Sequence, residues 1–246
     1  MRRYLVPLGF ILAAAISITI YEFLPQLGEI GKNMQNGGPL VAALILLIIL
    51  QTSFIIERLL SLRKAQGRGS LPEFLNAVRK RLHNGDVDGA IKICAAQRGS
   101  AANVIRAGLE RYQQVKADGA PKEKIVAETQ AAIQEANGLE VPLLERNLIA
   151  LSTIASISTM IGLLGTVIGM IRSFAALGHT GAVDASKLAV GISEALINTA
   201  GGLFSAIAGI VAYNVFVTRV DNFNYMMDEA SYEAVQLLSA STSDRK

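Results

Sequence analysis

The sequence has no tryptophan, one cysteine and two histidines, and only 17% of its residues are charged. The single cysteine, Cys94, excludes an intramolecular disulfide framework and is expected to be a small buried residue of a helix. His83 and His179 fall on opposite sides of the membrane topology predicted below, so they are not expected to share a metal. The chain also lacks a phosphate loop, zinc-ligand spacing and a nucleophile elbow. We therefore expect no enzyme, no cofactor and no metal site.

The few charges are dispersed, with a formal net charge of +3, so no nucleic-acid partner is expected. Hydrophobic residues make up 51% of the chain, which is high for a soluble domain. No charged side chain lies between Arg146 and Arg172, and Glu194 alone lies between Lys187 and Arg219. Both runs exceed the roughly 20 residues that cross a hydrocarbon core about 30 Å thick. The chain is predicted to be an integral membrane protein in contact with lipid.

Two further uncharged runs, Tyr4–Tyr21 and Asn33–Ile56, precede this pair. No strand pattern is convincing, so the fold class is all-α, with three to four transmembrane helices and long cytoplasmic helical extensions. We predict five segments: 1–25, a transmembrane span or signal anchor; 26–57, a periplasmic linker and span; 58–148, a cytoplasmic helical domain; 149–218, a central transmembrane helix pair; and 219–246, a cytoplasmic helix and tail. A short outer loop, Leu177–Ala185, joins the central pair.

Basic flanks after Ile56 place the middle segment in the cytoplasm by the positive-inside rule. With 1–25 retained, both termini are cytoplasmic; cleavage of this run as a signal peptide would leave three crossings. Within the cytoplasmic domain, Ser70 and Glu73 form a capping-box pattern, and Asp86 is a candidate cap for the next helix. A helix from about Pro121 is expected to run almost directly into the span at Ile149.

The first central helix carries hydroxyl residues along one face. Ser152, Ser156, Thr159 and Thr166 recur at helical spacing, with Gly162, Gly165 and Gly169 near them. In lipid, close approach and interhelical hydrogen bonds decide which helices associate. The glycines are predicted to pack helix against helix. For Thr166, packing and pore lining are both open.

The second central helix carries a polar face that includes a carboxylate. Glu194, Asn198, Gly201 or Gly202, and Ser205 share this face, with Thr199 and Gly191 beside it. An ionised carboxylate at mid-bilayer costs at least about 2.5–3.5 kcal/mol, so such groups usually face a bundle interior or a wet cavity. Glu194 therefore belongs either to an ion path or partner-helix contact, or to an ion pair with Lys187 or Arg172.

These motifs resemble the ExbB/TolQ branch of the MotA/TolQ/ExbB proton channel family. The resemblance covers about residues 30–235 and rests on the order and spacing of the paired motifs, which are Gly162-Leu-Leu-Gly165-Thr166-Val167-Ile168-Gly169, Ser173-Phe174, Gly191-Ile-Ser-Glu194-Ala195-Leu196-Ile-Asn-Thr199-Ala200 and Tyr213-Asn214.

The resemblance implies a ring subunit, typically of a pentamer, in the bacterial inner membrane. Such rings surround a dimer of a single-span ExbD/TolR-like partner, and proton flow drives motion that reaches a TonB-like or TolA-like protein. Proton-path and pore-lining candidates are Thr166, Glu194 and Thr199, joined by Asn198, Ser205 and Thr159. Helix-packing candidates are Gly162, Gly165, Gly169, Gly191, Gly201 and Gly202.

Two positions depart from the family pattern: Ala208 stands where proline is frequent, and Asn198 stands where an apolar residue is common. The favoured function is an ExbB-like subunit that energises TonB-dependent outer-membrane transport. A TolQ-like envelope-maintenance subunit and a motility stator are alternatives within the family. A membrane scaffold that conducts no ions is the alternative from another class.

Overall fold

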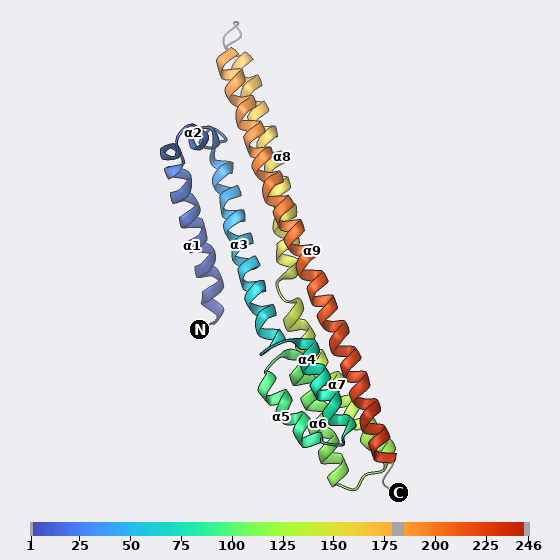
Figure 1. Ribbon diagram of the computed structural model, residues 1–246. Helices are drawn as coiled ribbons and strands as arrows, with labels where there is room; N and C mark the ends of the chain where they lie inside the picture. The colour runs from blue at the N-terminus through green and yellow to red at the C-terminus, as the bar shows by residue number, and fades with distance from the viewer. Residues whose placement is uncertain (1, 179–184, 244–246) are drawn as a thin grey trace. The chain divides into compact units, whose positions relative to one another are not determined.

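The computed structural model describes residues 2–178 and 185–243, and every regular element in these ranges is a helix. The predicted loop at 177–185, with His179, lies largely outside the described residues. The elements are α1 (Arg2–Phe23), the 3-10 helix η1 (Leu24–Leu27), α2 (Glu29–Gln35), α3 (Pro39–Gln66), α4 (Leu71–His83), α5 (Val87–Gln97), α6 (Ser100–Ala117), α7 (Lys122–Glu145), α8 (Leu148–Gly178) and α9 (Ala185–Ser243). Figure 1 shows this order. The all-α prediction is confirmed.

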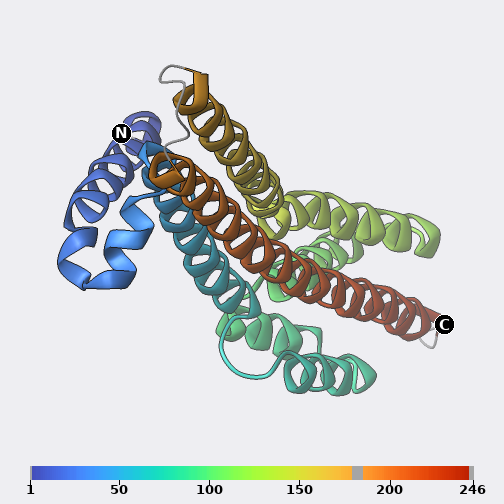
Figure 2. The same ribbon diagram turned by 90° about the horizontal axis from the view of Figure 1, so that it is seen from above.

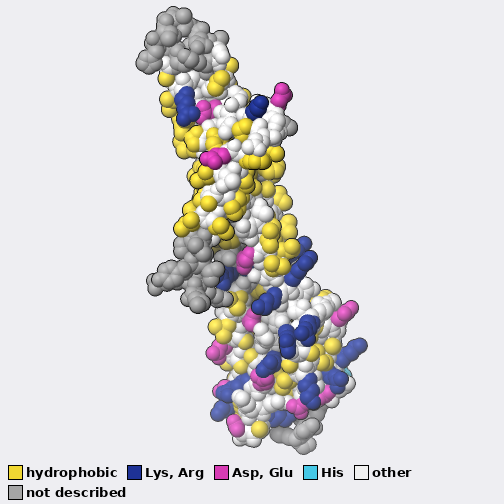
Figure 3. All heavy atoms as spheres, turned by 90° about the vertical axis from the view of Figure 1, so that its left-hand side faces the viewer, with side chains coloured by type: hydrophobic (Ala, Val, Ile, Leu, Met, Phe, Trp, Pro, Cys, Tyr) yellow, Lys and Arg dark blue, Asp and Glu magenta, His cyan; other side chains and the backbone are white. Residues whose placement is uncertain are grey.

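The chain divides into two compact units. The first unit comprises Met1–Glu57 and Asn147–Val215, and the second comprises Arg58–Arg146 and Phe216–Lys246. Four helices of the described chain are long and apolar enough to cross a membrane, so the predicted multi-pass membrane architecture is confirmed. On the face that Figure 3 presents, hydrophobic side chains cover much of the first unit, whereas both signs of charge are scattered over the second.

The first unit is built from the four apolar runs, which fold as helices because a helix satisfies its own backbone hydrogen bonds in lipid. The short elements η1 and α2 connect α1 to α3, and the two long helices lie side by side in Figures 1 and 2. Ala13 and Ser17 are buried on α1, and the Ser17 hydroxyl donates to the Ala42 carbonyl of α3. The linker predicted between these spans is therefore largely helical.

One stripe of α3 is buried, whereas most of its surface within the first unit is partly or fully exposed. Val41, Leu44, Leu47 and Gln51 form the stripe at intervals of three or four residues. The basic residues after Ile56 end the apolar run without ending the helix, which continues to Gln66.

The second unit has an apolar core centred on α6, which packs against α5 and α7. Val104, Ile105, Leu109 and Tyr112 of α6 are each at most 2% exposed. Burying large side chains of this kind stabilises a fold by about 1.5–3 kcal/mol each. From α9, Val220 and Met227 are equally buried, so the part of the last helix that lies in the second unit also presents a buried apolar face.

Local signals define the helix ends of the second unit. The Asp86 carboxylate accepts a hydrogen bond from the Gly89 amide at 2.8 Å, as expected of a helix cap. The Arg81 guanidinium lies 2.6 Å from the same carboxylate; the Gly89 hydrogen bond and then Arg81 hold the pKa of Asp86 below its ordinary value. Helix α4 begins after Ser70, but the Ser70 side chain makes no cap hydrogen bond, so that part of the prediction is wrong.

The helix predicted to run into the Ile149 span is interrupted. Helix α7 contains Pro142 and ends at Glu145, and Asn147 then adopts a left-handed conformation with φ of 61° before α8 begins. Asparagine is among the residues that tolerate this region best. The buried Arg58 guanidinium donates to the Leu144 carbonyl at 3.1 Å, which satisfies a backbone acceptor that the end of α7 leaves open.

Candidate functional site

The candidate site lies where α8 and α9 pack together in the first unit, and glycines make this packing possible. A Cβ atom at Gly202 would lie 2.6 Å from the Ser158 carbonyl oxygen and 2.8 Å from Cα of Gly162. A Cβ atom at Gly169 would lie 2.7 Å from the Gly191 carbonyl oxygen. These neighbours are backbone atoms, which cannot yield as a flexible side chain can. The close approach of α8 and α9 therefore requires glycine at these positions.

Glycine also meets side chains in this region. At Gly165 a Cβ atom would lie 2.3 Å from Cβ of Asn198, and at Gly201 it would lie 3.2 Å from a methyl carbon of Leu44 on α3. Gly201 therefore faces α3 rather than the α8–α9 contact.

Glu194 is buried and paired with a cation. The Arg172 guanidinium of α8 donates to the Glu194 carboxylate of α9. Only 8% of the Glu194 side chain is exposed, against 53% of the Arg172 side chain. A paired carboxylate avoids much of the penalty of an isolated buried charge. The pairing with Arg172, one of the two interpretations of Glu194 from the sequence, is present; the side chain of Lys187 lies outside the described residues.

The turn before α3 completes the surroundings of Glu194. Gly38 has φ of +75°, and a Cβ atom there would lie 2.5 Å from a Glu194 carboxylate oxygen. Its neighbour Gly37 offers a carbonyl oxygen that accepts a hydrogen bond from the Asn198 amide at 2.6 Å. Only glycine combines this backbone conformation with this close approach. The Gly37–Gly38 turn therefore seats α3 directly against the polar face of α9.

Asn198 is fully buried and joins three parts of the unit. Its amide nitrogen donates to Gly37 and, at 3.0 Å, to the Glu194 carbonyl. Its side chain also fills the space that Gly165 leaves open on α8. The side-chain oxygen of Asn198 (Oδ1) has no hydrogen-bond partner among the described residues. The unusual asparagine thus links α3 to α9 beside Glu194.

A second polar contact holds α8 and α9 together further along the helices. The hydroxyls of Ser158 and Ser205 lie 2.9 Å apart, and both side chains are buried. The Gln51 amide of α3 reaches the same place: oriented to satisfy both of its groups, it donates to the Ser205 carbonyl and accepts from the Gly209 amide, each at 3.1 Å. A buried amide of this kind fixes how α3 packs on the pair.

The remaining predicted pore residues are half-buried threonines. The hydroxyl of Thr166 donates to the Leu163 carbonyl at 2.6 Å, and that of Thr159 donates to the Ala155 carbonyl at 3.3 Å. Thr199 is shared between helices, because its hydroxyl lies 3.3 Å from the Gly162 carbonyl and 3.2 Å from the Ala195 carbonyl.

The six predicted pore residues do not form one cluster in the described chain. Glu194 and Asn198 lie together, Ser205 belongs to the contact with Ser158, and neither Thr159 nor Thr166 is hydrogen-bonded to these groups. Their assignment to a proton path stays a prediction.

The glycine face and the predicted hydroxyl face of α8 are not the same face. Ser158 and Ser173 are fully buried with the glycines, whereas Ser152 and Ser156 remain partly or fully exposed. Ser158 lies two residues after Ser156 and one before Thr159, and one residue corresponds to about 100° around a helix. Sequence reasoning thus missed Ser158 and Gln51, although spacing from Gly162 and Gly165 would have identified Ser158.

In the second unit, the shifted pKa values arise from burial, hydrogen bonds and salt bridges that belong to the fold of that unit. Burial raises the pKa of the Cys94 thiol to about 12, and the salt bridge with Arg111 lowers the pKa of the exposed Glu128 carboxylate. Among the described residues, no three His, Cys, Asp or Glu side chains come together in a way that would hold a metal ion.

Comparison with known proteins identifies one family. The profile of the MotA/TolQ/ExbB proton channel family matches residues 96–229, which is more than half of the chain and excludes α1, α2 and α3. Some curated proteins named ExbB and some named TolQ are similar to parts of the chain.

The Synechocystis sp. ExbB-like protein 3 is 45% identical over 91 residues, which are 36% of this chain and 43% of that protein. The Haemophilus influenzae Tol-Pal system protein TolQ is 43% identical over 111 residues, 45% of this chain and 48% of that protein. The Aquifex aeolicus biopolymer transport protein ExbB is 34% identical over 113 residues, 46% of this chain and 69% of that protein. The chain thus spans about half the length of the first two relatives.

Proposed function

The chain belongs to the MotA/TolQ/ExbB proton channel family, and from this premise we propose that it is the proton-conducting ring subunit of an inner-membrane motor. The ring is a homo-oligomer, with five copies as the expected number, around a dimer of a single-span ExbD/TolR-type partner. Proton flow down the proton-motive force moves the partner against the ring. The second unit and both termini lie in the cytoplasm, consistent with the basic residues that follow Ile56.

The observation that carries this proposal is the buried Glu194 beside α3, Arg172 and Asn198, in a run of α9 that has no other charged side chain between Lys187 and Arg219. A carboxylate held in a membrane-spanning segment is a functional group by default. Small residues around Glu194 keep α8 and α9 close together. Thr159 and Thr166 are only half-buried in this packing, so their side chains can line the ring's pore. The partner's own titratable group completes the proton path.

Proton flux into vesicles tests the assignment. The chain and its partner are reconstituted together, and acidification is followed with a pH-sensitive dye under an imposed membrane potential. We expect Glu194→Gln and Thr166→Val to reduce flux at least tenfold while leaving the ring intact in native mass spectrometry. Thr153→Val is the matched control for Thr166→Val, because the Thr153 hydroxyl also bonds its own helix, to Ile149 at 2.8 Å, on an exposed position. Full flux in both site variants would show that the pore assignment is wrong.

Within the family, we propose the ExbB-like role, in which the motor energises TonB-dependent outer-membrane transport. The relative named TolQ supports a second candidate, the TolQ-like role in envelope maintenance; a motility stator is the third. Deletion of the gene separates them: loss of iron–siderophore uptake indicates the first, detergent sensitivity the second, and a motility defect alone the third.

A scaffold that conducts no ions is the candidate from another class, supported by the glycine packing and the Arg172–Glu194 pair. It predicts that Gly202→Ala impairs function whereas Glu194→Gln leaves it unchanged. The flux measurement therefore also decides between motor and scaffold.

A further inference from the structure

The second unit contains a cavity whose lining is apolar on most sides and basic at two points. Its volume is about 480 Å³, within the range of small-molecule sites. The walls come from the end of α3, the first turn of α4 and the middle of α9. Buried Leu71 and Phe223 form a fixed apolar surface, and Met226 lies beside them. The cavity can therefore accept an apolar chain.

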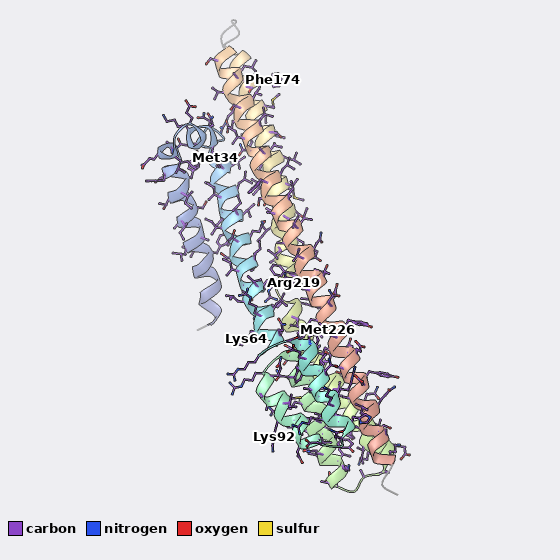
Figure 4. The ribbon with its side chains drawn as sticks, in the orientation of Figure 1. Met34, Lys64, Lys92, Phe174, Arg219 and Met226 are labelled. Carbon is purple, nitrogen blue, oxygen red and sulfur yellow. The ribbon has the colours of Figure 1, made fainter. Side chains whose placement is uncertain are left out.

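Two arginines from different helices border this cavity. Arg63 comes from α3 and Arg219 from α9, and both side chains are exposed. Within the described residues neither guanidinium has an ion-pair partner, and no carboxylate lines the cavity. Figure 4 shows Arg219 and Met226 on α9, with Lys64 near the end of α3. The cavity thus has two cationic groups that lack an anion.

The position of both arginines along their helices indicates the source of that anion. Arg63 follows Ile56, the end of an uncharged run, by seven residues in one continuous helix, and Arg219 directly follows the run that ends at Thr218. At about 1.5 Å per residue, Arg63 lies about 10 Å beyond the apolar run. The headgroup region extends only several ångströms beyond each side of the hydrocarbon core. An arginine side chain can extend back along its helix and spans the remaining few ångströms, so both guanidinium groups are within reach of lipid headgroups.

We propose that this cavity binds an anionic phospholipid of the adjacent leaflet, with the phosphate between Arg63 and Arg219 and part of an acyl chain against Phe223 and Met226. Guanidinium groups pair with phosphate through two parallel hydrogen bonds, and basic pockets on the positively flanked side of membrane helices suit anionic headgroups. Because α4 and α9 contact the same lipid, the lipid content of the membrane stabilises this part of the second unit. The proposal does not depend on proton conduction.

A single introduced tryptophan gives a direct readout, because the chain has none of its own. Met226→Trp places the reporter in the cavity wall; Tyr225→Trp is its control, since Tyr225 is 69% exposed and does not line the cavity. The full-length protein is titrated with brominated phosphatidylglycerol or brominated phosphatidylcholine in neutral detergent micelles. We expect saturable quenching of Met226→Trp by phosphatidylglycerol, and weaker quenching by phosphatidylcholine.

Charge variants in the Met226→Trp background then locate the headgroup. Arg63→Gln with Arg219→Gln should weaken phosphatidylglycerol binding about 30-fold, the effect expected for two basic groups near an anionic surface. Lys64→Gln with Arg68→Gln removes the same charge from the same flank, but neither residue lines the cavity, so binding should change less than threefold. Native mass spectrometry of the proteins without tryptophan should show the same loss of lipid adducts.

Four outcomes would overturn the proposal. Equal quenching by both lipids would show a site without headgroup selectivity, and equal losses in the two double variants would show a general surface-charge effect. Displacement of the lipid by millimolar glycerol phosphate would identify a site for a small free anion. A reporter that responds to dissociation of the oligomer but not to lipid would identify a second copy of this chain as the occupant.

Discussion

The two units are both helical bundles, but different atoms hold them together. In the first unit, backbones touch at glycines, and the buried polar groups of Ser158, Ser205 and Asn198 bond across helices. In the second unit, large apolar side chains fill the core, and ion pairs such as Arg111–Glu128 lie on the surface. Lipid offers no hydrophobic gain for helix association, whereas water does. The expected surroundings, lipid for the first unit and water for the second, therefore explain which kinds of residue each unit buries.

The largest expected effect is the loss of a core side chain from the second unit. Leu109 is 1% exposed, and Leu109→Ala should destabilise the unit by about 2–5 kcal/mol because it leaves a cavity among fixed neighbours. Thermal unfolding of the full-length protein in detergent, followed by circular dichroism, measures it. Leu139→Ala is the control, since Leu139 is 69% exposed and should change the midpoint little. A comparable loss in the control would mean that another chain covers Leu139.

A smaller loss is expected from adding one methyl group to the first unit. Gly202→Ala brings a Cβ atom against the backbone of α8, and such overpacking typically costs about 1–3 kcal/mol. Gly138→Ala has no atom within 4 Å of the new Cβ and should be neutral or slightly stabilising, because alanine favours helices. The same unfolding measurement applies. If both variants unfold at the wild-type midpoint, α8 and α9 are not in backbone contact.

Weaker still is the coupling between Ser158 and Ser205. A double-mutant cycle with Ser158→Ala and Ser205→Ala should give about 0.6 kcal/mol, the average for hydrogen bonds between membrane helices. Ser156→Ala is the control, because the exposed Ser156 hydroxyl bonds its own helix, at the Ser152 carbonyl, and has no other hydrogen-bond partner among the described residues. Additive effects of the two serine substitutions would show that the hydroxyls do not interact.

The smallest effect is expected for Cys94, whose buried thiol should react very little at neutral pH. Burial raises its pKa to about 12 from an ordinary value of 9.0. Because this pKa is raised in the folded state, burial of the protonated thiol has its full effect on the free energy of unfolding below pH 9. That effect is lost as the pH rises from 9 toward 12, because the unfolded chain then releases the proton more readily than the folded one. Maleimide labelling of the native protein should therefore be slow between pH 7 and about pH 9, and urea should accelerate it. Rapid labelling without denaturant at pH 7 would contradict burial of the thiol.

Sequence patterns predicted the helices of both units because apolar runs and helical periodicity depend on residues close in the chain. The Asp86 cap was predictable for the same reason, since its bond to Gly89 spans three residues. Ser70 shows the limit of such motifs: the capping-box residues are present and the helix starts there, yet the bond is absent. The break at Asn147 had only weak signals, a proline shortly before it and a residue type that tolerates positive φ.

The candidate site was only partly predictable, because its contacts join residues far apart in the chain. Glu194 was recognisable as an isolated carboxylate, and Arg172 as one of two possible partners. Gln51 lies in the uncharged run Asn33–Ile56, and nothing local indicates that its amide reaches Ser205 and Gly209. Equally, the bond from Asn198 to Gly37 spans 161 residues. Such pairings follow from how α3 packs, which hydropathy alone does not specify.

Helix α9 is uninterrupted over its 59 residues, about 88 Å at 1.5 Å per residue. Each residue advances the helix by about 100°, so the direction in which the Met227 side chain leaves the helix depends on the number of helical residues before it. Insertion of one residue after Val215 would turn every later side chain by that angle and remove Met227 from its buried face. The chain near Asn147, already outside a helix, could absorb such an insertion. An inserted residue should therefore be tolerated near Asn147 but not after Val215.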